Sequence, residues 1–242
     1  MNHLSGKVAL VTGAAKNLGR AIANDLSKQG AKVAIHYHTS KKDALKTLRE
    51  VNKFSEGMIV KANLTTAEEV VSMFRNIETK LDSVEILINL VGNFIFDSIS
   101  ATSFEKFRDV IESNLYATFL CSQKVLPAMK KKRWGRIINF GSVAADAITI
   151  RQKTTPYYIA KTGVIMLTKV LAYEYAKYDI TINSISPGIL KTSIAKPPTP
   201  SGKYAQFEDI TNTINFLLKK ESGYINGANI EVSGGWRPGF SG

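Results

Sequence analysis

The first thirty residues contain an apolar stretch, a glycine turn and an amphipathic run, in that order. Lys7 to Thr12 has the composition of a buried strand, and residues 21–29 repeat apolar side chains at helical spacing. Gly13 permits a tight turn, Gly19 lets the helix pack close to the sheet, and the first free N–H groups of the helix can hold a phosphate. An ordinary β-α turn has the same pattern, so this segment alone leaves both interpretations open.

Further apolar segments alternate with helical patterns along the chain. Strands are predicted near residues 7–12, 32–37, 57–62, 85–90, 136–141, 180–186 and 228–232. The chain has 242 residues and is 44% hydrophobic, enough for one sizeable core. We therefore expect an α/β fold in one domain spanning residues 1–242, a Rossmann-type doubly wound sheet of about seven parallel strands with helices on both faces.

Tyr157 and Lys161 are four residues apart in a segment with helical character. On a helix they would share one face, with Cβ atoms roughly 5–6 Å apart. An ammonium beside a phenol stabilises the phenolate, so Lys161 is expected to lower the pKa of Tyr157 and fit it for general acid catalysis. Tyr158 would point about 100° away around the helix. The alternative interpretation is a core aromatic beside a solvated lysine.

Ser142 directly follows a predicted buried strand, Gly135 to Gly141. Ligands gather at the carboxyl ends of strands in open α/β sheets, so its hydroxyl could hydrogen-bond a carbonyl oxygen. A serine in this position is also common as a turn residue or helix cap.

The order and separation of these motifs resemble the short-chain dehydrogenase/reductase family from Lys7 to Gly235. The family's glycine motif matches Thr12 to Gly19, with Asn17 replacing the middle glycine. Asparagine tolerates left-handed backbone, so the turn is expected to survive. The resemblance implies that NADPH delivers hydride to a carbonyl that Ser142 and Tyr157 polarise. Tyr157 donates the proton, Lys161 holds the ribose, and Asn114 holds a water in the proton relay.

The resemblance also assigns the cofactor-binding positions. They are Gly13, Lys16, Asn17, Leu18 and Gly19; His36, Tyr37, His38, Thr39 and Ser40; Asn63 and Leu64; Asn89, Val91 and Gly92; Tyr157 and Lys161; and Pro187, Gly188, Ile189 and Thr192.

The end of the second predicted strand indicates NADPH/NADP+ rather than NAD. Family members that prefer NAD carry an aspartate there, whereas this chain has Tyr37. Lys16 and either Lys41 or Lys42 could approach a 2′-phosphate, although the latter two could equally begin a solvated helix. Two unit charges ~4 Å apart near a protein surface attract each other by ~4 kcal/mol, and a third of that energy would give a roughly tenfold preference for NADPH.

Within the family, the chain is most similar to 3-oxoacyl-[acyl-carrier-protein] reductases. Its net charge of +12 suits an acidic partner. The basic run Lys130, Lys131, Lys132 and Arg133 matches the subfamily's docking site for an acidic acyl carrier protein, although a solvated helix end explains it equally well. The segment 193–206 is about a dozen residues shorter than the subfamily's lid, so an open cleft is expected. The resemblance also implies a homotetramer, with helices near 104–132 and 157–178 pairing across one interface.

Two alternatives remain. The residues around Lys16 and His36 to His38 resemble pteridine reductases, although these usually place aspartate at the position of Ser142. The second alternative is a protein that senses dinucleotides without turnover. Such a protein would keep the glycine turn that binds the cofactor but would not need Ser142, Tyr157 and Lys161.

Other classes of function are not expected. One cysteine, Cys121, excludes an internal disulfide and a cysteine metal cluster, and we expect it to be buried; three histidines do not form a metal site. No recognition helix or stacking platform accompanies the positive charge, which argues against nucleic acid. The absence of a signal-like or membrane-spanning stretch predicts a cytoplasmic enzyme.

Overall fold

The computed structural model describes residues 3–147, 152–193 and 195–238. Seven parallel strands form one sheet in the order β3-β2-β1-β4-β5-β6-β7. The strands are β1 (Val8–Val11), β2 (Lys32–Tyr37), β3 (Gly57–Lys61), β4 (Ile86–Asn89), β5 (Gly135–Phe140), β6 (Ile180–Pro187) and β7 (Asn229–Val232). The predicted Rossmann-type sheet is confirmed, and each expected strand lies within two residues of its predicted bounds.

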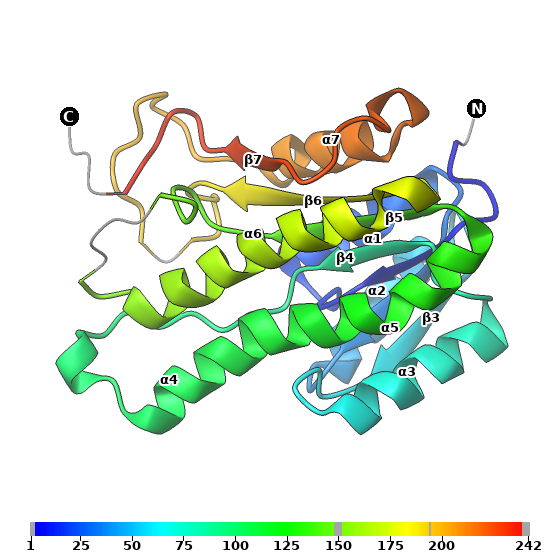
Figure 1. Ribbon diagram of the computed structural model, residues 1–242, viewed down its shortest axis with the longest axis horizontal. Coiled ribbons are helices and arrows are strands. Elements are labelled where there is room, and N and C mark those ends of the chain that lie inside the picture. Colours follow the sequence, from blue (N-terminus) through cyan, green and yellow to red (C-terminus); the bar gives the residue numbers. More distant parts are fainter. Residues whose placement is uncertain (1–2, 148–151, 194, 239–242) are drawn as a thin grey trace.

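Helices cover both faces of the sheet (Figure 1). The α-helices are α1 (Asn17–Lys28), α2 (Lys41–Val51), α3 (Ala67–Lys80), α4 (Phe104–Ile111), α5 (Ala117–Lys132), α6 (Thr155–Tyr175) and α7 (Phe207–Leu218). Short 3₁₀ turns lie at η1 (Ile99–Ala101), η3 (Ala176–Tyr178) and η4 (Lys220–Ser222), and a π-helical turn, η2 (Glu112–Tyr116), joins α4 to α5.

Two apolar cores follow from the alternation of side chains along each strand. Ala9 and Val11 of β1 pack in the core that contains α1, α2 and α7. Val8 and Leu10 point to the opposite face, into the core that contains α3 and α5. Because both faces are covered, the strands read as continuous apolar runs rather than alternating ones.

The parallel arrangement brings the ends of all seven strands to one edge of the molecule. The arrowheads of β6 and β7 point to the left in Figure 1, so the loops that follow the strands gather there. The strand order reverses between β1 and β4, which opens a crevice for ligands at this edge.

Buried amide and hydroxyl groups hold the middle of the sheet to the helices. Asn89 on β4 donates from Nδ2 to Oδ1 of Asn139 on β5 (2.9 Å) and to Oγ of Ser122 on α5 (3.1 Å). Asn139 in turn donates to Oγ1 of Thr168 on α6 (2.9 Å). These four side chains are at most 4% exposed, so each depends on the others to satisfy its polar atoms.

Replacing Asn139 by alanine should therefore destabilise the fold. Asn89 and Thr168 would each lose a buried partner, at a cost of about 2–4 kcal/mol in the free energy of unfolding. Urea denaturation followed by circular dichroism measures this cost. Asn76→Ala on the exposed side of α3 is the matched control and should change stability by less than about 0.5 kcal/mol. A cost for Asn139→Ala as small as the control's would contradict the network's role.

Candidate active site

Lys161 lies on α6 with its side chain directed at the end of β5. Its Nζ donates a hydrogen bond to the carbonyl oxygen of Phe140, the last residue of β5, at 2.7 Å. The side chain is buried, and Nζ lies 5.5 Å from the centroid of the Tyr157 ring. Tyr157 and Lys161 thus share one face of α6, as their spacing predicts.

Ser142 completes a cluster with these two residues. It lies two residues beyond the end of β5, with its hydroxyl close enough to the Tyr157 phenol to lower the pKa of that group. Tyr158 points elsewhere: its hydroxyl donates to the carbonyl oxygen of Val143 at 3.3 Å. Tyr157 is therefore the tyrosine that faces Ser142.

The prediction that Lys161 would draw down the pKa of Tyr157 is wrong for the protein alone. Burial raises the pKa of the Tyr157 phenol well above its usual value, the nearby Tyr158 raises it further, and the Ser142 hydrogen bond lowers it only in part. Burial also lowers the pKa of the Lys161 ammonium from 10.5 to about 8. Tyr157 consequently keeps its proton at neutral pH, the state that a proton donor needs.

Asn114 lies in the π-helical turn η2 and is fully buried. Its Nδ2 donates to the carbonyl oxygens of Asn93 (2.8 Å) and Val110 (2.9 Å), whereas its Oδ1 has no protein partner. A Cβ at Gly92 would lie 2.0 Å from that oxygen, so only glycine fits there. Asn114 thus fixes the backbone that follows β4, and its role in a proton relay stays a prediction.

The glycine turn between β1 and α1 has the backbone that its sequence predicted. Asn17 has φ +50°, which confirms that asparagine takes the left-handed conformation, and Gly13 has φ +68°. A Cβ at Gly19 would lie 2.3 Å from the carbonyl oxygen of Gly13, so the turn has no room for a side chain there. This close cradle at the start of a twelve-residue helix fits a pyrophosphate.

His36 lies beneath this turn and is 2% exposed. Its Nδ1 accepts a hydrogen bond from the N–H of Gly13 (3.1 Å), and its Nε2 faces the carbonyl oxygen of Ala62 (3.0 Å). The only neutral tautomer that satisfies both contacts carries its proton on Nε2. The structure therefore gives His36 the role of holding the turn, and a contact of this residue with the cofactor stays a prediction.

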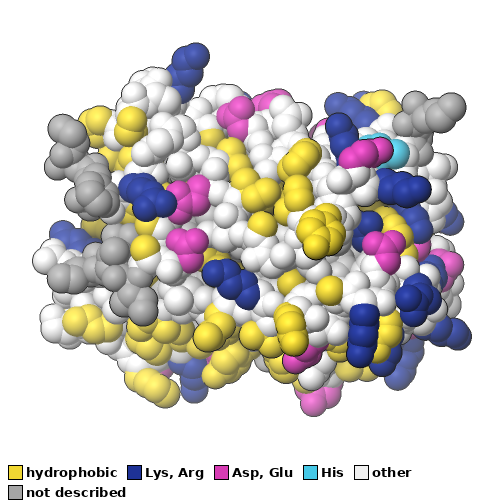
Figure 2. Space-filling model, turned by 45° about the horizontal axis from the view of Figure 1, so that its top comes forward, with side chains coloured by type: hydrophobic (Ala, Val, Ile, Leu, Met, Phe, Trp, Pro, Cys, Tyr) yellow, Lys and Arg dark blue, Asp and Glu magenta, His cyan; other side chains and the backbone are white. Residues whose placement is uncertain are grey.

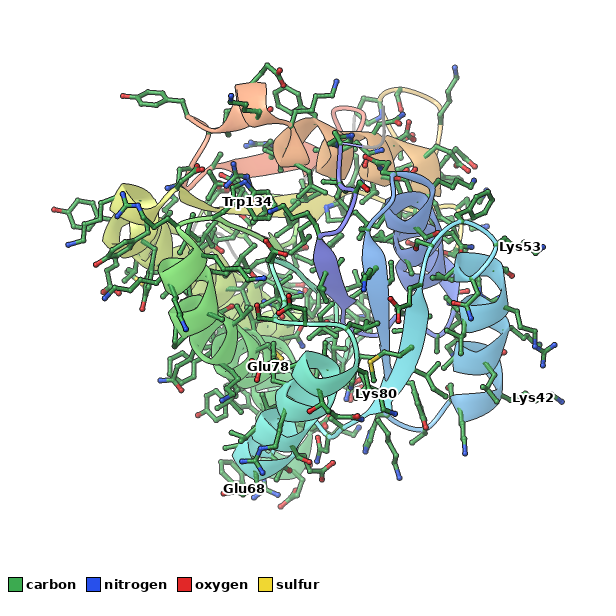
Figure 3. All side chains as sticks on the ribbon, turned by 90° about the vertical axis from the view of Figure 1, so that its right-hand side faces the viewer. Lys42, Lys53, Glu68, Glu78, Lys80 and Trp134 are labelled. Atoms are coloured by element: carbon green, nitrogen blue, oxygen red, sulfur yellow. The ribbon has the colours of Figure 1, made fainter. Side chains whose placement is uncertain are left out.

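A hollow of about 470 Å³ opens beyond the ends of β2 and β3. Its lining consists of Tyr37, His38, Thr39, Lys41 and Lys61. None of these is acidic, and two are cationic. Lys42 instead points away from the protein at the N-terminal end of α2 (Figure 3), so of Lys41 and Lys42 only Lys41 lines the hollow.

Other predicted positions have contacts that the sequence did not reveal. Oδ1 of Asn63 accepts hydrogen bonds from the N–H (3.1 Å) and the hydroxyl (2.9 Å) of Thr65, which leaves its Nδ2 without a bond inside this turn. The Asn89 side chain belongs to the buried network described above. Gly188, at the end of β6, packs so closely on Ser233 that a Cβ would lie 2.7 Å from its Cα.

Thr12 has a structural role that its sequence pattern did not predict. Its hydroxyl donates to the carbonyl oxygen of Ile88 (3.2 Å) and accepts from the N–H groups of Leu90 (2.8 Å) and Val91 (3.2 Å). One side chain at the end of β1 thus shapes the loop after β4. The sequence feature that could have indicated this role is a polar residue directly after an apolar strand.

The described part of the chain bears on metal and thiol sites in two ways. It contains no group of three histidine, cysteine or acidic residues placed to hold a metal ion. Cys121 is buried as expected, and burial raises the pKa of its thiol to about 12. None of the helices within residues 3–147, 152–193 and 195–238 has the length and apolar character that crossing a membrane requires.

The chain is similar to known proteins over nearly its whole length. A family model described as enoyl-(acyl carrier protein) reductase matches residues 13–237. The 3-oxoacyl-[acyl-carrier-protein] reductases of Staphylococcus aureus and Vibrio cholerae are 34% and 35% identical over 95% and 96% of this chain, and over 97% and 98% of their own. A crystal structure from Agrobacterium tumefaciens, provisionally described as a gluconate dehydrogenase, superposes with a TM-score of 0.90 at 30% identity over 97% of both chains.

The contacts of His36 predict a pH dependence of stability. Burial lowers its pKa from 6.5 to about 4. Between pH 6.5 and about pH 4, His36 is protonated in the unfolded chain but stays neutral in the folded chain. The free energy of unfolding should therefore fall by about 3 kcal/mol as the pH is lowered through that window, and His36 should cause no change above it. Urea unfolding at stepped pH measures this loss. His36→Gln should remove this part of the slope, whereas His38→Gln, at an exposed position, should keep it. Equal slopes in all three proteins would refute the assignment.

Proposed function

The chain belongs to the short-chain dehydrogenase/reductase family, and we propose that it uses NADPH to reduce the ketone of a 3-oxoacyl thioester to a secondary alcohol. The observation that carries this proposal is the cluster of Ser142, Tyr157 and Lys161 at the end of β5. Support for the substrate comes from the relatives named for that activity, which are similar over nearly their whole length.

The residues that would hold the cofactor lie around the crevice. The turn from Gly13 to Gly19 would take the pyrophosphate, and the hollow beside Tyr37 and Lys41 would take the 2′-phosphate. Asn63 and Leu64 would meet the adenine. Pro187, Gly188, Ile189 and Thr192 would meet the nicotinamide amide. When bound, NADPH supplies the hydride.

The chain's own residues would polarise the carbonyl oxygen of the substrate and protonate it. Hydroxyls of Ser142 and Tyr157 donate hydrogen bonds to it, and these bonds strengthen as negative charge develops. Tyr157 transfers its proton to the oxygen, and the Lys161 ammonium stabilises the phenolate that is left. The high pKa of Tyr157 before reaction keeps the proton in place until the oxygen becomes basic enough to take it.

We further propose that a docking surface for an acidic carrier protein lies where α5 and α6 end. Lys132 is engaged with Asp82 (3.7 Å) and Glu85 (3.4 Å), whereas Lys130 and Lys131 are exposed. The Arg133 guanidinium donates to the carbonyl oxygen of Lys177 (3.2 Å), and Nζ of Lys130 lies 4.9 Å from the Tyr178 ring centroid. Lys130, Lys131, Arg133 and Lys177 form the basic surface in this proposal.

This basic surface lies at the opposite end of the sheet from Ser142. Arg133 precedes β5 and Ser142 follows it, and Lys and Arg side chains gather at the right-hand end of Figure 2, where the strands begin. A carrier docked there would be remote from Ser142 of the same copy, so this docking proposal depends on the proposed homotetramer to bring a second cleft within reach. Exposed apolar side chains along α5 and α6, among them Phe119, Met166 and Tyr173, support pairing through these helices.

A pteridine is the second candidate substrate. Phe94 is 57% exposed, and its ring meets that of Tyr157 edge-on at 5.0 Å between centroids. Phe96 lies nearby in the sequence and is 63% exposed. Exposed aromatic faces beside the reacting phenol would suit a flat ring. Ser142 argues against this candidate, because a serine hydroxyl is too weak an acid to protonate a ring nitrogen.

NADPH oxidation with acetoacetyl thioester, dihydrobiopterin and quinones separates the candidates. Tyr157→Phe should lower the rate at least about 100-fold with NADPH affinity unchanged, because only the proton donor is lost. Tyr224→Phe, at a fully exposed tyrosine, is the control and should retain the rate. An undiminished rate in Tyr157→Phe would show that Tyr157 is not the proton donor. Turnover of dihydrobiopterin but not of the thioester would make a pteridine the substrate.

Charge reversal tests the docking surface. Arg133→Glu should raise KM for an acyl-carrier-tethered ketone roughly tenfold while leaving KM for the same ketone on coenzyme A unchanged. Added salt should reduce the difference in this KM between Arg133→Glu and the unmodified chain. Lys53→Glu makes the same change of charge near the end of α2, remote from this surface (Figure 3), and should affect neither substrate. Equal effects of the two variants would exclude the surface.

A further inference from the structure

The turn that carries Ser142 adopts an unfavourable backbone conformation. The N–H of Ala145 donates to the carbonyl oxygen of Ser142 at 3.0 Å, which closes a four-residue turn. Ala144, its third residue, has φ +58°. A turn with positive φ at that position favours glycine, because a Cβ clashes with the backbone there. The surrounding structure must therefore hold Ala144 in place.

A side chain of the last strand binds this residue. Oε1 of Glu231 on β7 accepts a hydrogen bond from the N–H of Ala144 at 2.7 Å. The other carboxylate oxygen lies 3.4 Å from the guanidinium of Arg237, which keeps the carboxylate oriented. Charge-assisted hydrogen bonds to carboxylates are stronger than those between neutral groups. Glu231 is thus suited to fix the one backbone N–H that the strained residue presents.

A second contact joins the same turn to the same strand. Asn229 lies two residues before Glu231, so both side chains are on one face of β7. Its Nδ2 donates to Oδ2 of Asp146 at 3.0 Å. β7 therefore holds the segment after Ser142 at two points. In Figure 1 this segment lies beside the ends of β6 and β7.

Helix α6 holds the other side of the turn. The hydroxyl of Tyr158 donates to the carbonyl oxygen of Val143, and that of Thr162 to the carbonyl oxygen of Ala145 at 2.6 Å. Because α6 also carries Tyr157, any shift of the turn relative to α6 would change the distance between the Ser142 and Tyr157 hydroxyls. The Glu231 contact opposes such a shift from the far side.

We propose that Glu231 is a positioning residue that sets the reactive geometry of Ser142 by holding Ala144 in its left-handed conformation. The effect on turnover rests on the proposed reductase function, whereas the effect on the turn does not. Glu231 touches neither Ser142 nor Tyr157 in the contacts described, so it acts through the backbone. A misplacement on the order of 1 Å at a reacting group can cost up to about 100-fold in rate.

The test compares Glu231→Ala with Glu231→Gln, which keeps an acceptor oxygen. Glu231→Ala should speed amide hydrogen exchange at Ala144, measured by NMR, by about tenfold or more. With acetoacetyl thioester it should lower kcat about tenfold while leaving the Kd for NADPH unchanged. Glu231→Gln should stay within about threefold on both measures, because its side-chain oxygen still accepts the hydrogen bond. Glu221→Ala, at an exposed glutamate before β7, should change neither measure.

Ala144→Gly supplies a rescue that a purely stabilising role would not predict. Glycine adopts positive φ without strain, so adding it to Glu231→Ala should restore most of kcat. Unchanged exchange at Ala144 in Glu231→Ala would overturn the proposal, as would faster exchange with full turnover. An unmodified protein that turns over no ketone would remove the reductase function, and the exchange comparison would still decide whether Glu231 holds the turn.

Discussion

The hydrogen bond from the Lys161 ammonium to the Phe140 carbonyl is the contact on which the arrangement of the site depends. It joins the middle of α6 to the last residue of β5 in a buried environment. The same helix carries Tyr157, and the same strand leads directly to Ser142. A buried ammonium without a partner would be costly, so this contact fixes both the position of α6 and the orientation of Lys161.

Side chains at the ends of the other strands perform a related task. Thr12 after β1, His36 in β2 and Glu231 in β7 each bind backbone groups of a loop that follows a different strand. Loops at the carboxyl edge of a parallel sheet have no ladder to satisfy their N–H and carbonyl groups, and these side chains supply the missing partners. The rigidity of the crevice therefore comes from polar residues whose contacts are distant in sequence.

Burial changes the electrostatic view of the candidate acid. The sequence suggests a phenol made acidic by its neighbouring ammonium, whereas the folded chain raises the pKa of Tyr157 and lowers that of Lys161. Both shifts have the same cause, because burial disfavours the charged form of each group. A protonated tyrosine beside a lysine with a pKa of about 8 can donate at neutral pH and leave an anion that the lysine stabilises.

The sequence by itself determined where the strands lie along the chain, the parallel sheet, the glycine turn with a left-handed Asn17, and the shared face of Tyr157 and Lys161. These features follow from local periodicity and backbone preference, which neighbouring residues carry. Only the tertiary structure decided that His36 lies under the glycine turn, that Lys41 rather than Lys42 lines the hollow, that the basic run is remote from Ser142, and that Glu231 reaches Ala144. Each of those depends on which segments distant in sequence become neighbours and on how deeply they are buried, and neither quantity is written in a local pattern.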